Sequence, residues 1–237
     1  EYYPMEPNSI NSYVRFMKEL LFDHVDILPE NAHVPDGLLT KEQIADYCHE
    51  YEAKIEALGG IDLQILGIGG NGHIGFNESG SLQNSKTRLV ALDHITRVAA
   101  SKDFYGLNNT PRTAITLGVK KIMEAKRVIL LAWGEGKANI VKRSVEDEVT
   151  NRVPASFLQE HNNAVFILDK EASSKLTRVN KPWLVEKIVW TDKLTRKAVL
   201  GLALDLKKPI LMLTDADYIE NGMSDLLADS GPAYDTN

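Results

Sequence analysis

Apolar residues recur at helical spacing in the first sixty residues. The first stripe consists of Ile10, Tyr13, Val14, Met17, Leu20 and Leu21. Ser9 or the asparagine before it can cap this stripe, which predicts a helix over about residues 9–24. The second stripe consists of Ile44, Cys48, Tyr51, Ile55 and Leu58. Thr40 and Gln43 form a capping-box pattern ahead of it, and Gly59-Gly60 follows, so we expect a second helix between them.

Short apolar runs alternate with helical stretches through the middle of the chain. The runs that predict strands are residues 61–66, 88–92, 127–133 and 164–168. The helical stretches between or after them are residues 119–125, 137–147 and 155–159. This alternation favours an α/β fold with a mostly parallel sheet between layers of helices, in which ligands bind at the carboxyl ends of the strands.

The chain changes character from about residue 173. A linker is expected at residues 180–183, a helix at 193–206 and a strand at 208–213. We therefore treat residues 173–237 as an extension of the first domain.

Composition excludes several classes of protein. The 237 residues include 27 Lys+Arg and 33 Asp+Glu, a formal charge of −6, and 43% are hydrophobic. These values are typical of a globular chain and argue against a disordered one or a broad nucleic-acid-binding surface. The single cysteine, Cys48, fits a reducing compartment, and no apolar run approaches the roughly 20 residues of a membrane span. We expect a soluble, cytoplasmic protein.

A glycine-rich loop follows the strand predicted at residues 61–66. Residues 67–72 match G-x-G-x-x-G, and Asp93 lies at a distance suited to a ribose-binding acid. A dinucleotide site also needs a helix directly after the loop. Residues 73–81 are too rich in Gly, Ser and Asn for a helix, so we expect no nicotinamide cofactor and no other cofactor.

The same loop carries candidate acid/base chemistry. His73 and Glu78 lie five residues apart, and Asn71 can converge with them on one small polar ligand. A neighbouring carboxylate would hold the imidazole in one tautomer and raise its proton affinity, as general acid/base catalysis near neutral pH requires. The alternative is a loop histidine that is merely satisfied by local hydrogen bonds.

Residues 66–78, Leu-Gly-Ile-Gly-Gly-Asn-Gly-His-Ile-Gly-Phe-Asn-Glu, closely resemble the signature of the glucosamine-6-phosphate deaminases. The resemblance extends over about residues 1–172. It includes residues 28–37, 96–99, 114–118 and 133–138. The related 6-phosphogluconolactonases carry a similar glycine-histidine turn, but the Phe76-Asn77-Glu78 ending favours the deaminases. The resemblance implies a Rossmann-like, three-layer fold of this superfamily.

The resemblance also implies a reaction. Members open the ring of glucosamine 6-phosphate, move a proton from C2 to C1 and release ammonia as fructose 6-phosphate forms. His73 would pass a proton to or from the ring oxygen, and Glu78 would belong to its relay. Asn71 stands where many members have Asp, so it could orient the imidazole without adding charge.

Further residues are implied as ligands of the substrate. Lys137, at an expected helix start, would bind the phosphate. Lys102 stands where many members have Arg. A lysine there would offer the phosphate a point charge in place of the bidentate contact of an arginine. Gly70 and Gly72 would let the backbone approach the sugar closely. For both lysines the alternative is an exposed surface side chain.

The resemblance places the catalytic aspartate immediately before Glu1, and the phosphate loop and first strands further upstream. We therefore expect residues 1–172 to be a deaminase-like domain without its N-terminal strands. Residues 1–237 alone should have negligible deaminase activity. Residues 173–237 resemble a segment that leads into a deacetylase in some bacterial proteins, so a further domain after residue 237 is one expectation. A docking arm or an oligomer contact is the other.

Two other functions stay open. One is a lactonase-type hydrolase of the same superfamily, and the other is a non-catalytic domain that binds a sugar phosphate. The expected partner is thus a small sugar phosphate, with a homo-oligomer possible and neither nucleic acid nor a membrane involved. The histidines lack metal-ligand spacing, and residues 215–222 fail the calcium-loop pattern, so no metal site is expected.

Overall fold

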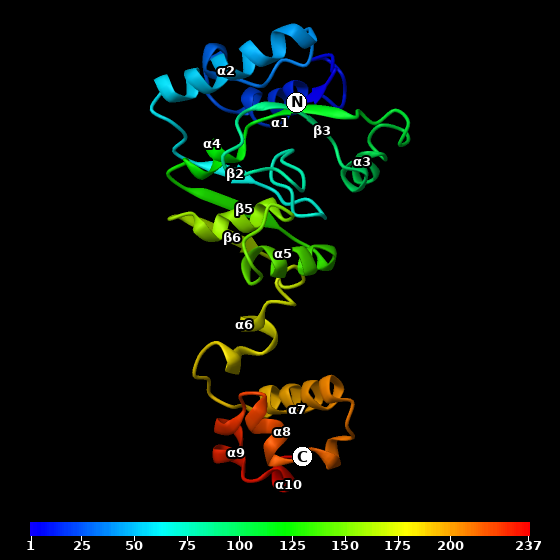
Figure 1. The fold of residues 1–237 in the computed structure, drawn as a ribbon, viewed down its shortest axis with the longest axis vertical. Helices are drawn as coiled ribbons and strands as arrows, with labels where there is room; N and C mark the ends of the chain where they lie inside the picture. Colours follow the sequence, from blue (N-terminus) through cyan, green and yellow to red (C-terminus); the bar gives the residue numbers. More distant parts are fainter. The chain divides into compact units, whose positions relative to one another are not determined.

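The computed structural model describes the backbone of residues 1–237 and all side chains except that of Tyr234. The chain divides into two compact units, Glu1–Ser173 and Ser174–Asn237 (Figure 1). Each unit is described separately below.

A parallel sheet forms the centre of the first unit. Its strands are β2 (Gln64–Leu66), β5 (Val128–Ala132) and β6 (Ala164–Leu168), in the order β2-β5-β6 (Figure 1). The middle strand is the most apolar, and its alternate residues Val128, Leu130 and Ala132 are buried. The predicted α/β fold with a parallel sheet and flanking helices is confirmed.

A second, antiparallel sheet was not predicted. It contains β1 (Tyr2–Tyr3), β3 (Arg88–Ala91) and β4 (Thr113–Thr116), in the order β1-β4-β3. The sequence predicted only β3. β1 has only two residues, and β4 (Thr-Ala-Ile-Thr) has two apolar residues between threonines, so neither contains an apolar run like the one that predicted β3.

Helices and 3₁₀ turns cover these sheets. The α-helices are α1 (Tyr13–Leu20), α2 (Lys41–Ala57), α3 (His94–Ala100), α4 (Val119–Met123) and α5 (Ala138–Val145). The 3₁₀ turns are η1 (Phe22–His24), η2 (Pro29–Asn31), η3 (Glu135–Lys137) and η4 (Pro154–Glu160). α2 packs Ile44 and Cys48 against Tyr3 and Ile115 of the antiparallel sheet. The predicted capping box of Thr40 and Gln43 begins α2.

Several predicted boundaries in the first unit are wrong. The first helix covers residues 13–20 rather than 9–24, because Ser12, not Ser9, caps it by accepting a hydrogen bond from Val14 N. Ile10 and Leu58, assigned to apolar stripes, are 66% and 72% exposed. Both lie outside the helices to which their stripes were assigned.

The strand predicted at residues 61–66 is also shorter than expected. It is paired only over Gln64–Leu66, and Ile65 is 59% exposed while Leu66 is buried. β2 lies at the edge of its sheet, and successive side chains point to opposite faces. The predicted helix at residues 155–159 lies within the 3₁₀ turn η4.

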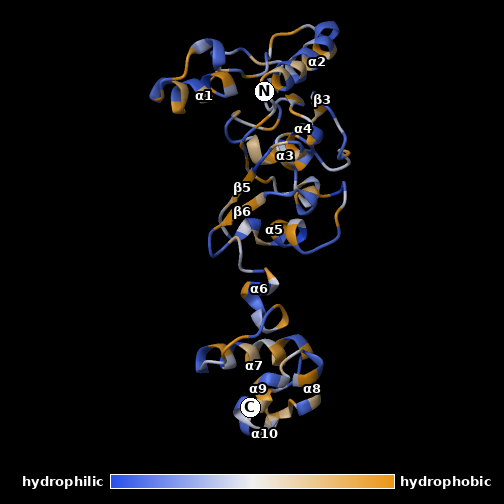
Figure 2. Cartoon of the chain, turned by 90° about the vertical axis from the view of Figure 1, so that its left-hand side faces the viewer, coloured by the Kyte–Doolittle hydropathy of each residue, from blue (hydrophilic) through white to orange (hydrophobic). Residues whose placement is uncertain are grey.

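The second unit is helical. Its elements are α6 (Thr177–Asn180), η5 (Pro182–Leu184), α7 (Asp192–Leu206), η6 (Ile210–Met212), α8 (Asp215–Glu220), α9 (Ser224–Ser230) and α10 (Ala233–Thr236). Hydrophobic residues are distributed over α7, α8 and α9 (Figure 2), and Leu202, Tyr218 and Leu226 belong to one buried core.

The prediction of a helix at residues 193–206 is confirmed by α7. The predicted strand at 208–213 is wrong, because this segment forms η6 and leaves Leu211 84% exposed. The predicted linker at 180–183 lies at the junction of α6 and η5. Within the residues that the structure describes, no helix combines the length and the apolar character needed to cross a membrane.

Candidate active site

The glycine loop begins where β2 ends. It turns back at once, because Gly72 N donates to Gly69 O over 3.0 Å and Gly69 N donates to His73 O over 3.0 Å. No helix follows, since residues 73–81 form turns and one isolated bridge. Asp93 is the N-cap of α3, where its carboxylate accepts from Ile95 N over 2.7 Å. The structural context that a dinucleotide loop needs is therefore not present in these residues.

Two glycines of the loop are required by close packing. A Cβ at Gly69 would lie 2.3 Å from ring atoms Cε1 and Nδ1 of His73, so the imidazole rests directly on this backbone. Gly72 has φ +86°, and a Cβ there would lie 2.7 Å from Val153. At Gly70 an added Cβ would meet only Ile95, at 3.9 Å. Direct substrate contacts by Gly70 and Gly72 stay predictions.

The structure brings His73, Glu78 and Asn71 together. His73 Nδ1 lies 3.2 Å from Glu78 Oε2, and Asn71 Nδ2 donates to the same oxygen over 2.7 Å. Asn71 Oδ1 in turn accepts from the backbone N of His73 over 3.2 Å. Asn71 thus orients the Glu78 carboxylate through its side-chain NH₂ group and the backbone of His73 through its side-chain oxygen.

Glu78 is a buried, ionised carboxylate. Its side chain is 11% exposed, and burial alone would raise its pKa. Hydrogen bonds from His73, Thr96 and Asn71 and the charge of His73 outweigh burial and hold this pKa at about 2. Its second oxygen, Oε1, accepts from the backbone N of Asp93 over 3.2 Å. An ionised carboxylate can only accept hydrogen bonds, so its neighbours must be donors.

This requirement determines the tautomer of His73. Because Glu78 accepts at Nδ1, the neutral imidazole carries its proton on Nδ1 and leaves the lone pair on Nε2. Among the described residues, Nε2 has no hydrogen-bond partner, and the side chain is 16% exposed. Nε2 is therefore available to exchange a proton with a ligand.

Thr96 was missed as a site residue. It lies on α3, is 7% exposed, and places Oγ1 3.1 Å from His73 Nδ1. The sequence offered one signal, since Thr96 begins the segment 96–99 that resembles the deaminases. Its contact with His73 spans 23 residues and depends on where α3 packs, so spacing could not reveal it.

The two predicted phosphate ligands, Lys137 and Lys102, lie in different surroundings. Lys137 ends η3 after β5, and its Nζ donates to Ile68 O within the glycine loop over 2.7 Å. Burial lowers the pKa of Lys137. Lys102 is exposed in the turn after α3, and its side chain makes no hydrogen bond or ion pair with the described residues. Only Lys137 is brought to the loop that carries His73.

A hollow of about 860 Å³ borders the loop. Its lining includes Gly67, Gly75, Phe76 and Thr116. His73 does not line it. In the described part of the chain no three His, Cys, Asp or Glu side chains lie together as metal ligands. Residues 215–220 of the rejected calcium-loop segment form the helix α8.

The fold and site define an α/β protein with a histidine-carboxylate pair at the carboxyl end of a parallel strand. Residues 4–167 match the family profile described as glucosamine-6-phosphate isomerases/6-phosphogluconolactonase. The chain belongs to this family, as the resemblance of the loop indicated.

Curated relatives are named as deaminases. The chain is 51% identical over all 237 residues to a glucosamine-6-phosphate deaminase-like protein of Bacteroides thetaiotaomicron, and it spans 36% of that protein's length. It is 47% identical over 176 residues to the glucosamine-6-phosphate deaminase of Halothermothrix orenii, a match that covers 74% of this chain and 72% of that one. The first relative thus also matches residues 174–237, which lie beyond the family profile.

Solved structures agree with this assignment. The fold is similar to that of a monomeric glucosamine-6-phosphate deaminase, with a TM-score of 0.71, 36% identity and coverage of 74% of this chain and 72% of the other. A 6-phosphogluconolactonase from Trypanosoma brucei has a TM-score of 0.55 and 20% identity over 74% of this chain and 72% of its own. The lactonase shares the fold, whereas the deaminases also share much of the sequence.

Proposed function

We propose that these residues belong to an amino-sugar-phosphate deaminase that converts glucosamine 6-phosphate and water to fructose 6-phosphate and ammonia. The observation that carries this proposal is the arrangement of His73. Its Nδ1 is held by an ionised carboxylate while its Nε2 has no partner among the described residues. The names of the curated relatives support this choice of substrate over a lactone.

In this proposal His73 opens the sugar ring. Protonated Nε2 gives its proton to the ring oxygen as the C1–O5 bond breaks, and the unprotonated Nε2 takes the proton of the C1 hydroxyl as the aldehyde forms. Glu78 stabilises the imidazolium, and Asn71 keeps the carboxylate in place. A positioned acid/base of this kind contributes about two to four orders of magnitude in rate.

Lys137 is proposed as the phosphate ligand, with Lys102 as a second, more exposed charge. Nζ of Lys137 uses one of its three hydrogens on Ile68 O, so two remain for phosphate oxygens. An anion beside this half-buried ammonium would also offset the cost of its burial. At Gly70 and Gly72 the backbone would come close to the sugar, because glycine has no side chain.

The wider setting is part of the same proposal. A deaminase of glucosamine 6-phosphate acts in amino-sugar metabolism, as part of N-acetylglucosamine catabolism. The single cysteine, Cys48, is free and buried, which supports a reducing compartment such as the cytoplasm.

The test is substrate choice by the protein as its gene encodes it. Purified protein is offered glucosamine 6-phosphate or 6-phosphogluconolactone, with ammonia release and lactone hydrolysis measured side by side. We expect ammonia release and little lactone hydrolysis. Hydrolysis without ammonia would identify a lactonase, and tight sugar-phosphate binding without turnover would identify a binding domain.

A further inference from the structure

The hydroxyl of Thr96 makes polar contacts in addition to the packing of its side chain. Its hydroxyl is buried against the histidine-carboxylate pair, 3.1 Å from His73 Nδ1, and it also hydrogen-bonds the Glu78 carboxylate. A valine of the same shape would fill this space equally well. The hydroxyl of Thr96 therefore contributes hydrogen bonds that a methyl group at the same position could not make.

The donors and acceptors at this point allow one arrangement. Nδ1 of His73 carries a hydrogen because Glu78 accepts there, so the Thr96 oxygen can only accept from Nδ1–H. The hydroxyl hydrogen is then free, and the Glu78 carboxylate is the acceptor that it reaches. The single Nδ1–H of His73 is then shared between Glu78 Oε2 and Thr96 Oγ1, and the hydroxyl links the imidazole to the carboxylate.

The Glu78 carboxylate makes a second hydrogen bond at the start of α3. Oε1 of Glu78 accepts from Asp93 N over 3.2 Å, directly before α3 (His94–Ala100). Asp93 and Thr96 together join this helix to both members of the pair. A shift of α3 would therefore move the carboxylate and the imidazole together.

We propose that Thr96 is a positioning residue, whose hydroxyl bridges His73 Nδ1–H and Glu78 and so keeps the imidazole in the Nδ1–H tautomer with Nε2 directed to the ligand. The tautomer is a property of the unliganded chain. Its consequence for turnover rests on the proposed deaminase function.

Nuclear magnetic resonance of ¹⁵N-labelled histidine tests the tautomer on the 237-residue chain without any substrate. We expect neutral His73 to show a protonated Nδ1 and an unprotonated Nε2. The Thr96→Val variant should add a population of the other tautomer, and Thr96→Ser should restore the wild-type signal. An Nε2–H tautomer in the wild type, or a spectrum unchanged by Thr96→Val, would overturn the proposal.

Turnover is measured in the protein as its gene encodes it. We expect Thr96→Val to lower kcat about ten-fold with little change in KM, as loss of one hydrogen bond to a charged group predicts, and Thr96→Ser to recover most of it. Thr195→Val, a change of the same shape on α7, should leave kcat unchanged. Equal kcat for Thr96→Val and wild type contradicts the role of the hydroxyl. If the wild type releases no ammonia, the proposed function fails while the tautomer measurement still decides the role of Thr96.

Discussion

At the scale of single residues, Glu78 organises the site. Its two oxygens accept from Asn71, His73 and the backbone of Asp93. The convergence of Asn71, His73 and Glu78 could be predicted because the three lie within eight residues on one glycine-rich turn. The contacts from Asp93 and Thr96 could not, because they depend on how a helix folds back over the loop.

The depressed pKa of Glu78 makes folding stability depend on pH. This pKa is about 2 in the folded chain against an ordinary value of 4.5. The carboxylate therefore contributes about 3 kcal/mol of folding free energy, present in full above pH 4.5 and lost as the pH falls toward 2. We expect Glu78→Gln to be less stable than wild type at pH 6, and the difference to shrink by about half at pH 3.

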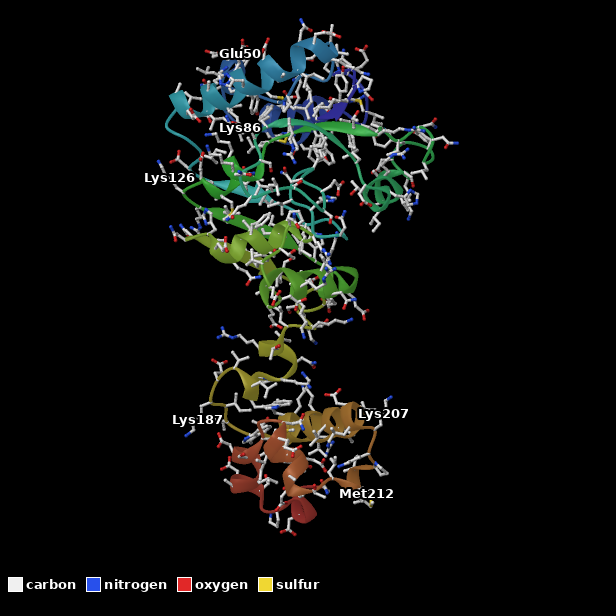
Figure 3. All side chains as sticks on the ribbon, in the orientation of Figure 1. Glu50, Lys86, Lys126, Lys187, Lys207 and Met212 are labelled. Atoms are coloured by element: carbon white, nitrogen blue, oxygen red, sulfur yellow. The ribbon has the colours of Figure 1, made fainter. Side chains whose placement is uncertain are left out.

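Urea unfolding at these two pH values measures the effect. Glu50→Gln is the matched control, because Glu50 lies on the exposed side of α2 (Figure 3) and makes no hydrogen bond or ion pair with the described residues. A stability difference between Glu78→Gln and wild type that is the same at both pH values would show that Glu78 is not held in its ionised form.

At the scale of elements, the sequence predicted those with strong local signals. The capping box of α2 and the apolar run of β5 both appear where expected. β4, Thr-Ala-Ile-Thr, has only two apolar residues and is stabilised by pairing with β1 and β3, which no local pattern shows. Residues 208–213 have a strand-like composition, but they have no partner strand and form η6.

The glycine loop provides a test at this scale. An added Cβ at Gly69 would collide with the His73 ring at 2.3 Å, whereas at Gly67 it meets nothing within 4 Å. We expect Gly69→Ala to displace the imidazole from Glu78 and to lower kcat/KM for ammonia release about a hundred-fold, the effect of misplacing a catalytic group by about 1 Å. Gly67→Ala should stay within about two-fold of wild type, since it adds no contact.

The two variants are compared in kcat/KM and in thermal unfolding. Equal kcat/KM for both would mean that the position of the ring on Gly69 has no part in turnover. A loss confined to Gly67→Ala would point to the hollow beside β2 as the site.

At the scale of the whole molecule, the chain contains two compact units, with the division between Ser173 and Ser174. We propose that residues 1–172 are the deaminase-like domain and residues 173–237 a separate extension. The sequence suggested this boundary, because the resemblance to the deaminases ends at about residue 172 and the chain changes character from about residue 173. The helical core of the second unit could not be predicted beyond α7, since its remaining helices have four to seven residues.

Independent folding of the units is tested by a core substitution. Leu226 is fully buried in the core of the second unit, so Leu226→Ala should cost about 2–5 kcal/mol there. We expect faster hydrogen exchange in α7 and α9 and unchanged exchange in β5. Leu211→Ala, at a side chain 84% exposed, is the control. Faster exchange in β5 as well would show that the two units unfold together.

The most direct test of the account is ammonia release by a His73→Gln variant of the protein as its gene encodes it. A His49→Gln variant serves as control, since His49 is exposed on α2. We predict that kcat/KM for glucosamine 6-phosphate falls at least about a hundred-fold in His73→Gln and is unchanged in His49→Gln. A His73→Gln protein that is folded and as active as the wild type would contradict the role of His73 as the proton-transfer group.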